Sequence, residues 1–524
     1  MAMRLIILHY HLRPGGIRRI IELATPELVR HFGGALRQVV IATGETGDPK
    51  WKEDFVHQLD GTSVEFFVER AFGYLSEQRA TVPELTKRIR LGLDCLLKGS
   101  ENERSICWAH NLGVGRNLIF TRELSRACER RGLPLLAHHH DWWFDNRWLR
   151  WPQMRRFGCR TLMTAARTVF PPATHIRHLT INQADARLLK RHFGKRVAWL
   201  PNLTENSALP SPARVTRARN WLREKLPEPD APIWILPCRL LRRKNVAEAL
   251  LLTRWLRPMA WLVTTGGVSS AEERAYLNRL ESAARQNKWP VRIGVLAEGR
   301  AGQPSVSELL AVSECVLLTS AQEGFGLPYL EAAVARRPLI ARALPNIAPD
   351  LARFGFRFPQ YYQEVLIPPG VFNWEAEVRR QHELFQRWQR QLPRASRPLA
   401  GIPFLLRCAP APEPVPFSRL TLTAQLEILT LPASESWERC IQLNPFLAEW
   451  KERATKGALE ISRWPRCAGD YLSGAAYARR WAAALARQVP KASNSASAIA
   501  AQQDFISWKL RPEYLYPLLW ATKT

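Results

Sequence analysis

The stretch SAQEGFGLPYLEAA, residues 320–333, combines acidic residues and glycines in a spacing that suits ligand binding. Seven residues separate Glu323 from Glu331, and two glycines and Pro328 lie between them. Glycines let a backbone approach a ligand closely, and a helix that begins at such a proline offers free amide groups to an anion. Ionised carboxylates are strong acceptors for the hydroxyl groups of a sugar or a ribose. The alternative interpretation is a glycine turn with Glu331 on a solvated helix face.

A basic stretch, CRLLRRKN at residues 238–245, follows an apolar run that predicts a strand. Ligands of open α/β sheets bind beyond the carboxyl ends of the strands. Arg239 would offer a diphosphate a forked contact, and Lys244 a point charge. Gly266 and Gly267, after the next apolar run, are a weaker signal of the same kind. Taken alone, the basic stretch is better explained as a surface loop of a basic protein.

Apolar runs alternate with helical patterns, such as 17–32 and 117–131, and this alternation predicts βαβ units with parallel sheets. A polar, proline-containing stretch near 201–230 divides the runs into two successive α/β halves. The predicted strands are 5–11, 38–43, 105–111, 135–141, 177–182 and 197–200 in the first half, and 232–236, 260–265, 291–296, 315–319 and 338–341 in the second.

The last quarter of the chain has a different character. Proline is frequent at 390–417, which predicts a loop or linker because proline interrupts both helices and strands. Helical spacing returns at 420–429 and at 477–488, whereas 491–501 is low in complexity and predicts a mobile segment. The nine cysteines are odd in number and include no C-x-x-C pair, which argues against a disulfide framework and a zinc ribbon.

Length, composition and charge exclude several classes of protein. The chain has 524 residues, 46% of them hydrophobic, which excludes a mainly disordered protein. No apolar run approaches the ~20 residues of a membrane-spanning helix and no signal peptide is recognisable, so we expect a soluble, cytoplasmic protein. The net charge of +28 would attract anionic partners such as nucleic acid, anionic lipid or phosphorylated small molecules, and a simply basic, solvated surface is the alternative interpretation. Because the arginines are scattered, we expect no specific nucleic acid, while a peripheral contact with an anionic membrane is compatible with the charge.

The order of the motifs resembles one family. R-x4-K after a strand, a glycine pair after the next, and E-x7-E after a later one resemble the retaining glycosyltransferases of the GT-B fold, specifically their large family-four group. EGFGLPYLEA matches that group's signature, and Pro14-Gly15-Gly16-Ile17 resembles its glycine-rich first turn. The resemblance implies an α/β fold with two Rossmann-like domains that face a cleft. We expect an acceptor domain at 1–205, a nucleotide-sugar donor domain at 206–430 and a helical extension at 431–524.

The resemblance also implies a role for each motif residue. Arg239 and Lys244 would stabilise the donor diphosphate as it leaves, and Glu331 would bind the nucleotide ribose. Two fixed cations can replace a metal ion, so the resemblance implies neither a metal nor a cofactor. The donor would further be held by Glu323 and by the backbone at Gly15, Gly16, Gly266, Gly267, Gly324, Phe325, Gly326 and Leu327.

The chain departs from the family pattern in three places. Cys238 precedes the arginine where the family usually has glycine, and the helix after Glu331 lacks its usual terminal glycine. The acidic residue that often follows the next strand is at best Asp350. These departures leave the nucleotide and the sugar open.

Three consecutive histidines end another predicted strand. The resembled family carries a histidine near this place that faces the reacting sugar, and we expect His139 or His140 in that role. Alternate residues of a strand share a face, so His138 and His140 would point together. His110 with Asn111 is a second candidate pair for the cleft. Adjacent histidines cannot readily all reach one ion, so no metal site is predicted; buried packing histidines are the alternative interpretation.

An aromatic cluster at 142–151 follows the histidines. Core packing is the simpler interpretation, and a platform on which the acceptor sugar stacks is the functional hypothesis.

The predicted function is transfer of a hexose from a nucleotide-diphosphate sugar to an unidentified acceptor, with retained anomeric configuration. The basic charge suits an anionic acceptor and suits docking on an anionic membrane surface equally well. The alternative is a catalytically degenerate GT-B scaffold that binds lipid or nucleic acid, which the net charge of +28 supports. The presence of Arg239, Lys244, Glu323 and Glu331 argues against the scaffold. A sugar-nucleotide epimerase or an inverting transferase agrees less well with E-x7-E.

Overall fold

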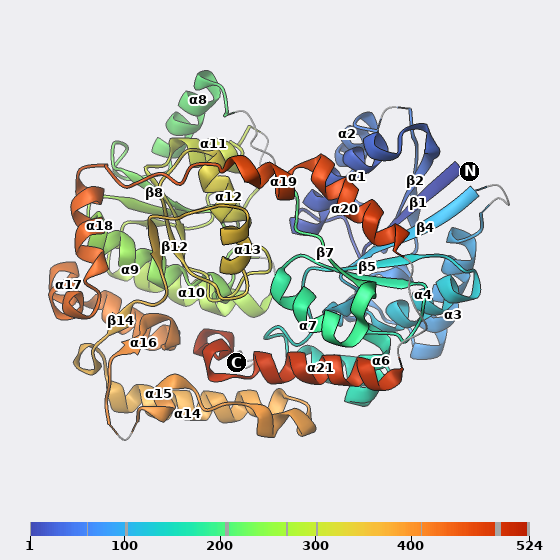
Figure 1. Ribbon diagram of the computed structural model, residues 1–524. Coiled ribbons are helices and arrows are strands. Elements are labelled where there is room, and N and C mark those ends of the chain that lie inside the picture. The colour runs from blue at the N-terminus through green and yellow to red at the C-terminus, as the bar shows by residue number, and fades with distance from the viewer. Residues whose placement is uncertain are drawn as a thin grey trace. The chain divides into compact units, whose positions relative to one another are not determined.

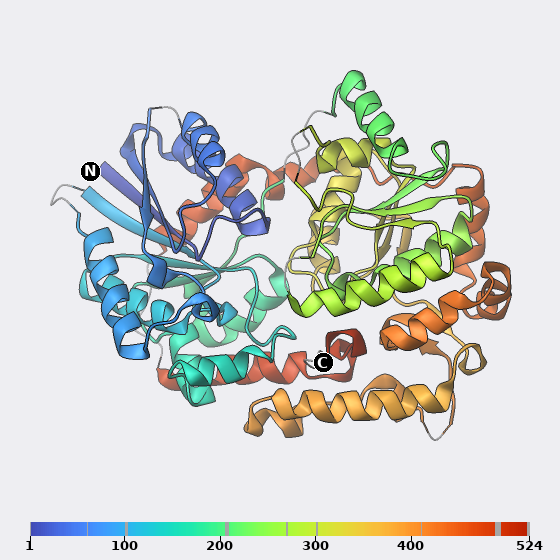
Figure 2. The ribbon, with the colours of Figure 1, turned by 180° about the vertical axis from the view of Figure 1, so that it is seen from behind.

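The computed structural model describes residues 2–59, 61–99, 103–204, 209–268, 271–299, 302–409, 411–487 and 494–520. The chain forms two compact units, each built on one parallel sheet with helices on both faces (Figure 1 and Figure 2). The first unit comprises Met1–Glu205, Gln391–Arg397 and Cys467–Lys509, and the second comprises Asn206–Arg390, Pro398–Arg466 and Leu510–Thr524.

The first unit contains a seven-stranded sheet in the order β3-β2-β1-β4-β5-β6-β7, and every neighbouring pair is parallel. Successive residues of the central strand β1 point into opposite cores, Leu5 and Ile7 into one and Ile6 and Leu8 into the other. Such a strand is buried on both faces and therefore reads as a continuous apolar run. The strands are β1 (Ala2–Leu8), β2 (Leu36–Thr43), β3 (Ser63–Val68), β4 (Glu103–His110), β5 (Leu135–His139), β6 (Ile176–Thr180) and β7 (Val197–Trp199).

Amphipathic helices cover both faces of this sheet. Several begin at a side chain that accepts a hydrogen bond from the first turn, as Asn117 does for α4 and Asn182 for α7. Helix α1 begins differently, at a glycine without a side-chain cap. The helices are α1 (Gly16–Phe32), α2 (Pro49–His57), α3 (Val82–Leu96), α4 (Leu118–Arg130), α5 (Arg150–Arg156), α6 (Leu162–Val169), α7 (Gln183–Phe193), α19 (Gly469–Leu472), α20 (Gly474–Ala486) and α21 (Ser495–Lys509).

The second unit contains a six-stranded parallel sheet in the order β10-β9-β8-β11-β12-β13. Its first strand is central and the order reverses between β8 and β11, as it does between β1 and β4 in the first unit. This is the Rossmann order, and ligands bind such sheets at the carboxyl ends of the strands on either side of the reversal. The strands are β8 (Ile233–Leu236), β9 (Trp261–Thr264), β10 (Val291–Arg292), β11 (Cys315–Leu318), β12 (Leu339–Arg342) and β13 (Gln360–Tyr362).

A short antiparallel pair, β14 (Leu366–Ile367) with β15 (Val415–Pro416), completes the strands described in the second unit. Its helices are α8 (Pro212–Arg223), α9 (Val246–Leu256), α10 (Ala271–Gln286), α11 (Val306–Val312), α12 (Leu327–Val334), α13 (Ala348–Arg353), α14 (Trp374–Gln391), α15 (Phe404–Arg407), α16 (Leu422–Thr430), α17 (Ala433–Cys440) and α18 (Phe446–Thr455).

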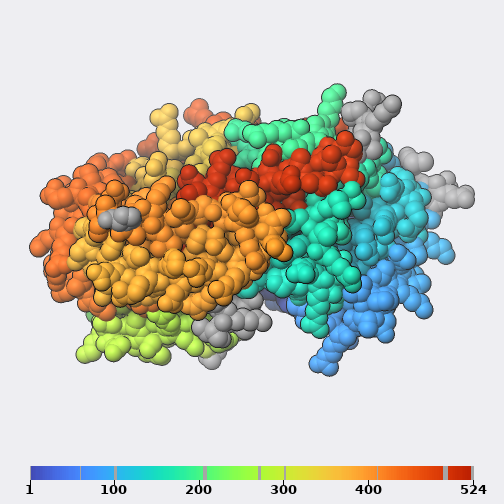
Figure 3. All heavy atoms as spheres, turned by 90° about the horizontal axis from the view of Figure 1, so that it is seen from below, coloured from blue at the N-terminus to red at the C-terminus, as the bar shows by residue number. Residues whose placement is uncertain are grey.

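The carboxy-terminal helices are divided between the two units. Helices α16, α17 and α18 pack against α9, whereas α20 packs on α1 and α21 lies along α6 and α7. Figure 3 shows α21 in red on the surface beside the blue-green segments that carry α6 and α7. A Cβ atom at Gly474 would lie 2.1 Å from Cδ of Glu27, so the glycine lets α20 approach α1 closely. The region expected as one extension, 431–524, is thus helical but packs in separate parts.

The predicted fold class, two Rossmann-like parallel-sheet units with a helical carboxy-terminal region, is confirmed. Four strands were not predicted, β3, β13, β14 and β15. β3 and β13 lie at an edge of their sheet, where a mixed pattern replaces the continuous apolar run. β15 and helix α15 lie within 390–417, so that stretch is not a loop throughout. The stretch near 201–230 contains helix α8, and Ser495 to Ala501 are helical rather than irregular. The rest of the predicted mobile segment, 491–493, lies outside the described residues.

The nine cysteines are free thiols. Within the described part of the chain, no helix combines the length and the apolar character that crossing a membrane requires.

Candidate functional site

Two loops of the second unit meet beyond the carboxyl ends of β8 and β11. The backbone N–H of Ala321 donates to the carbonyl of Arg243 at 2.7 Å, and the Thr319 hydroxyl donates to the carbonyl of Lys244 at 3.0 Å. The strands β8 and β11 are neighbours in the sheet, so their loops are held together by the topology. The basic stretch and the E-x7-E stretch, 74 or more residues apart in the chain, therefore form one site.

Arg243, Lys244 and Glu323 form a buried charge cluster in this site. The Glu323 carboxylate accepts from Nη1 of Arg243 at 2.8 Å and from Nζ of Lys244, and the Ser320 hydroxyl donates to it at 2.6 Å. The side chains of Lys244 and Glu323 are only 8% and 7% exposed. Burial alone would raise the pKa of Glu323, but the two cations outweigh it and lower the pKa to about 2. Glu323 is therefore a carboxylate at physiological pH.

A second buried network fixes the backbone beside Lys244. Asn245 adopts a left-handed conformation (φ 48°), and its side chain donates to Glu248 at 2.8 Å. Glu248 is fully buried and pairs with Arg342, while the Tyr362 hydroxyl donates to it at 2.6 Å. Because these groups join α9 to β12 and β13, the turn that carries Lys244 is tied to the core of the sheet. Asn245, Glu248 and Arg342 are positioning residues.

Arg239 lies at the exposed rim of the same edge, one residue after buried Cys238. A Cβ atom at Gly266 would lie 3.1 Å from the Cys238 carbonyl and 3.3 Å from Cα of Arg239. A Cβ atom at Gly267 would lie 2.8 Å from Cβ of Ala297. Both glycines thus have a packing reason within the unit, whether or not a ligand approaches them. Burial raises the pKa of Cys238 to about 11, so its thiol is protonated at neutral pH.

The glycines after Glu323 form the turn into helix α12. Gly326 caps the helix in a left-handed conformation (φ 79°), and a Cβ atom there would lie 2.7 Å from the Tyr329 ring, so this position requires glycine. Gly324, buried Phe325 and Leu327 complete the turn, and Asn346 donates to the Glu323 carbonyl at 2.9 Å. Glu331 lies within α12 and is partly exposed, whereas Asp350, in α13, is buried.

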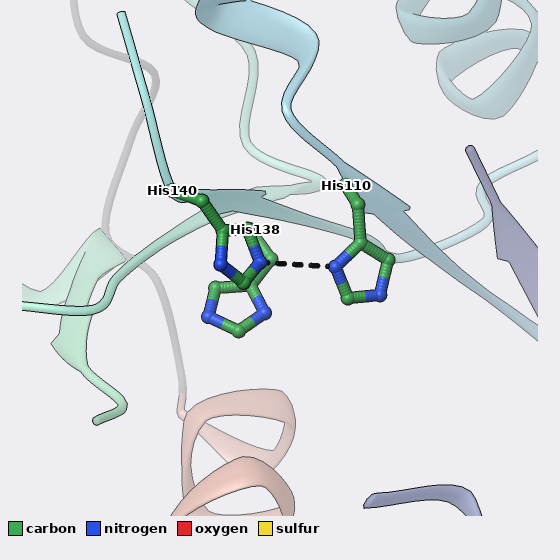
Figure 4. A group of neighbouring side chains, drawn as sticks. All are labelled: His110, His138 and His140. Atoms are coloured by element: carbon green, nitrogen blue, oxygen red, sulfur yellow. Dashed lines mark hydrogen bonds between the residues drawn. The ribbon is translucent and has the colours of Figure 1, made fainter. Parts of the chain in front are cut away.

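Three histidines meet at the corresponding edge of the first unit. His110 ends β4 and pairs in register with His138 of β5, and His140 follows two residues later on the same face (Figure 4). Ring centroids are 5.3 Å apart for His110 with each of the others and 4.2 Å apart for His138 and His140. Nδ1 of His110 and Nε2 of His140 form a hydrogen bond of 3.1 Å. We call these three residues the histidine triad.

The triad is neutral at physiological pH. Burial, followed by neighbouring imidazoles, lowers the pKa of His110 and His138 well below its usual range and that of His140 to about 3. The backbone of Leu200 acts in the opposite direction and raises the pKa of His138, but it does not outweigh burial. Neither ring nitrogen of His138 forms a hydrogen bond with a described residue. Asn111, in a left-handed conformation (φ 59°), accepts from the backbone N–H of His140 at 2.9 Å and so holds the loop after β5.

His139 points away from the triad. It is 1% exposed, hydrogen-bonds His178 at 3.0 Å and stacks on Trp142 at 4.3 Å between centroids. The alternation of side chains along the strand is as predicted, but the expectation of His139 at a cleft is corrected, because its ring is enclosed in the interior. His140 is the partly exposed member of the three consecutive histidines.

The aromatic cluster is core. Trp142, Trp143 and Phe144 have no exposed surface, and Trp148 and Trp151 are 2% and 7% exposed. Their rings pack on one another, and Nε1 of Trp142 donates to Asp185 at 2.8 Å. An acceptor sugar cannot stack on rings that are already covered, so the platform hypothesis is wrong.

Gly15 and Gly16 are exposed at the start of α1. A Cβ atom at Gly16 would meet nothing within 4 Å, and one at Gly15 only the Arg13 carbonyl at 3.9 Å. Unlike Gly266 and Gly267, these glycines have no packing reason in the described part of the chain.

Sequence reasoning missed Arg243, Ser320 and Asn245, which complete the charge cluster and its turn. It also missed the pairing of His110 with His138. Only the position of Arg243 beside Lys244 was a signal in the sequence; the others depend on which loops and strands become neighbours.

Comparison with known proteins finds a family match within the second unit. Residues 218–389, a third of the chain, match the family described as glycosyl transferases group 1. This range contains the charge cluster, Arg239, Glu331 and the glycine pair. The resemblance predicted from the motifs is confirmed for this part of the chain.

Curated relatives match longer stretches of the chain than the family does. The chain is 26% identical over 358 residues to mannosylglucosyl-3-phosphoglycerate synthase of Petrotoga mobilis, covering 66% of this chain and 65% of the relative. It is 25% identical over 254 residues to mannosylglucosylglycerate synthase of Thermotoga maritima, covering 45% of this chain and 57% of the relative. The chain thus spans less than two thirds of the length of these relatives.

Solved structures with a similar fold include Anabaena Alr3699/HepE in complex with UDP and glucose, with a TM-score of 0.47 and 14% identity over 85% of this chain and 98% of that chain. A second is a trehalose-6-phosphate protein from E. coli bound with UDP-2-fluoro glucose, with a TM-score of 0.46 and 14% identity over 93% of this chain and 100% of that chain.

Proposed function

We propose that this protein is a retaining glycosyltransferase that moves a hexose from a nucleotide-diphosphate sugar to an anionic acceptor without a metal ion or a cofactor. The observation that carries the proposal is the charge cluster, Arg243, Lys244 and Glu323, at the carboxyl ends of β8 and β11 beside the start of α12. The range that matches glycosyl transferases group 1 contains all of it.

In this proposal the cationic residues bind the diphosphate and the acidic residues bind hydroxyl groups. Lys244 and Arg239 neutralise the diphosphate as the bond between the sugar C1 and the phosphate oxygen breaks. The acceptor oxygen bonds C1 on the same face, and its proton passes to the leaving phosphate, so no nucleophilic side chain is needed. Glu323 and the turn Gly324–Leu327 orient the sugar hydroxyls, and Glu331 binds the ribose. The rigid second network keeps Lys244 in place between donor and Glu323.

An anionic acceptor agrees with two findings. The net charge is +28, and an excess of positive charge raises the local concentration of anionic ligands. The names of the relatives contain glycerate or phosphoglycerate, both acids. We therefore propose a glycosylated glycerate or phosphoglycerate as the class of acceptor.

A thermal-shift experiment tests donor binding first. The purified chain is melted with UDP, GDP, ADP and their glucose and mannose conjugates, with EDTA present throughout. A ligand that binds only the folded protein raises the melting temperature. We expect one nucleotide to do so in EDTA, and a response that appears only after a divalent ion is added would contradict metal independence.

The responding donor is then incubated with glycerate glycosides, with and without phosphate, and the linkage of the product is determined by NMR. An α-linked donor should give an α-linked product. An inverted linkage would refute the retaining mechanism, and stable binding of anionic lipid without any donor response would favour the scaffold.

A further inference from the structure

We propose that the histidine triad, His110, His138 and His140, binds one divalent transition-metal ion, and that Zn²⁺ suits the three ligands best. This site goes beyond the proposed function. That function assigns the diphosphate to cations of the second unit, whereas the triad belongs to the first unit and consists of imidazoles alone.

The fold places one nitrogen of each ring close to a nitrogen of each of the other two. One ring nitrogen of each histidine lies within 4.8 Å of the nitrogens of the other two. Nδ1 of His110 and Nε2 of His140 are already 3.1 Å apart. Two nitrogens on one tetrahedral Zn²⁺, each about 2.0–2.1 Å from the ion, are about 3.3 Å apart. Figure 4 shows the three rings beside one another, with the hydrogen bond between His110 and His140.

Buried nitrogens without partners are the second, independent observation. His138 has no exposed surface, and neither of its ring nitrogens has a hydrogen-bond partner among the described residues. Nε2 of His110, a residue 1% exposed, is likewise without a partner in the described part of the chain. A buried polar group without a partner destabilises the fold, so several such nitrogens at one place favour a bound ligand. A metal ion satisfies the lone pair that each neutral ring offers.

The ligand type selects the class of ion. Neutral imidazole suits Zn²⁺, Cu²⁺, Ni²⁺ and Fe²⁺, whereas Mg²⁺ and Ca²⁺ require oxygen ligands. The nearby carboxylate of Asp141 pairs instead with Arg147 at 3.0 Å. Three histidines leave a fourth tetrahedral position for water or another ligand, as in catalytic zinc sites. Asn111 steadies the set, because it accepts from the backbone of His140 and donates its own N–H to the His138 carbonyl.

From the sequence alone we predicted no metal site here, because three adjacent histidines, His138 to His140, cannot readily all reach one ion. The strand directs His139 into the interior, and the neighbouring strand β4 supplies His110 in its place. The ligands are therefore a pair at i and i+2 on one strand and a third residue in register on the next.

Metal titration of the full-length chain tests the proposal without reference to activity. Exposed Cys95 and Cys467 are first replaced by serine, so that surface thiols do not bind metal. The protein is stripped with a chelator, dialysed and titrated with Co²⁺ and then Zn²⁺. We expect one ion per chain, a visible Co²⁺ spectrum of tetrahedral type, and its loss when Zn²⁺ displaces Co²⁺. Mg²⁺ should neither bind nor change the melting temperature.

The variants His110→Ala, His138→Ala and His140→Ala locate the ion. Each should weaken binding by more than the ~10–100-fold that loss of an outer-shell partner causes. His192→Ala is the matched control, because His192 lies on α7 and pairs with Asp504, and it should bind as the parent does. His140 is partly exposed, so its variant retains the fold even where His138→Ala does not. Folded parent protein that takes up no ion, or uptake that is unchanged in His140→Ala and His110→Ala, would overturn the proposal.

Discussion

The charge cluster of the second unit and the histidine triad of the first occupy equivalent edges of two similar sheets. Each lies at the carboxyl ends of central strands, next to the point where the strand order reverses. In the charge cluster, one carboxylate meets two cations and a hydroxyl. In the triad, the rings are neutral and His138 has no hydrogen-bond partner among the described residues.

The difference shows how one fold prepares two kinds of site. Buried charges must be balanced within the protein, so the second unit surrounds Glu323 with partners and reinforces them through Glu248 and Arg342. Buried imidazoles avoid that requirement by remaining neutral, and their nitrogens stay available to a ligand. Removing a member of the charge cluster should therefore leave a buried charge with fewer partners, whereas removing a member of the triad should not.

The largest effect that we expect is on catalysis by Lys244→Ala. Loss of the cation that stabilises the leaving diphosphate should reduce the rate of transfer by about 100–1000-fold. The fold should persist, because Arg243 still pairs with Glu323. Steady-state kinetics and a thermal melt check both statements. Arg257→Ala is the matched control, since Arg257 pairs with Glu314 at the opposite end of β11. Turnover by Lys244→Ala equal to that of the control would refute the assignment.

The next largest effect is on stability, through Glu323→Gln. The pKa of Glu323 falls from its usual 4.5 to about 2, which corresponds to about 3 kcal/mol of stabilisation near neutral pH. Because the folded-state pKa is the lower one, this contribution is complete above about pH 4.5 and is lost as the pH falls toward 2. Unfolding is measured at neutral pH and at about pH 3. The difference in free energy of unfolding between wild type and Glu323→Gln should be smaller at about pH 3 than at neutral pH.

Glu314→Gln is the control for that experiment. Its ion pair with Arg257 is 26% exposed on the glutamate side, compared with 7% for Glu323, so its loss should cost at most about 1 kcal/mol. Equal losses in the two variants, or a gap for Glu323→Gln that is the same at both pH values, would break the distinction between buried and exposed pairs.

A smaller effect is expected from Glu331→Ala. If its carboxylate binds the ribose, the lost charged hydrogen bonds, about 1.5–3 kcal/mol, should weaken nucleoside diphosphate binding by roughly 10–100-fold. Calorimetry with the nucleotide identified in the thermal-shift experiment measures this change. Glu375→Ala, an 84% exposed glutamate on α14, should leave the affinity as it is. Unaltered affinity in Glu331→Ala would remove the ribose role.

The smallest effects compare glycines in the two units. Gly267→Ala places a Cβ atom 2.8 Å from that of Ala297 and should destabilise the second unit by about 1–3 kcal/mol. Gly16→Ala meets no atom within 4 Å and should change the stability by less than about 0.5 kcal/mol, while slowing transfer if a ligand approaches this turn. Thermal melts of both variants measure the changes in stability, and steady-state kinetics of Gly16→Ala measure the rate of transfer. Equal destabilisation would show that the turn at Gly16 is structural.

The sequence predicted the second unit better than the first. Glu323, Glu331 and Lys244 belong to short motifs whose spacing reflects a strand, a turn and a helix start, and such local patterns can be read directly from the sequence. In the first unit the sequence offered only the glycine-rich turn at 14–17 and the run of three histidines. Its strands could be predicted from their apolar runs, but the roles of its histidines depended on strand register, and the exposure of its tryptophans on helix packing.

By itself, the sequence determined the alternation of strands and helices, the two halves, and the residue types of the charge cluster, because these depend on local periodicity and on motif chemistry. Tertiary structure alone decided that Arg243 and Lys244 share Glu323, that His110 joins His138 and His140 while His139 is enclosed, and that the last helices divide between two units. Those outcomes depend on which strands become neighbours in a sheet and which faces the helices cover. Contacts between residues far apart in the chain are set by packing of the whole unit, and no short pattern encodes them.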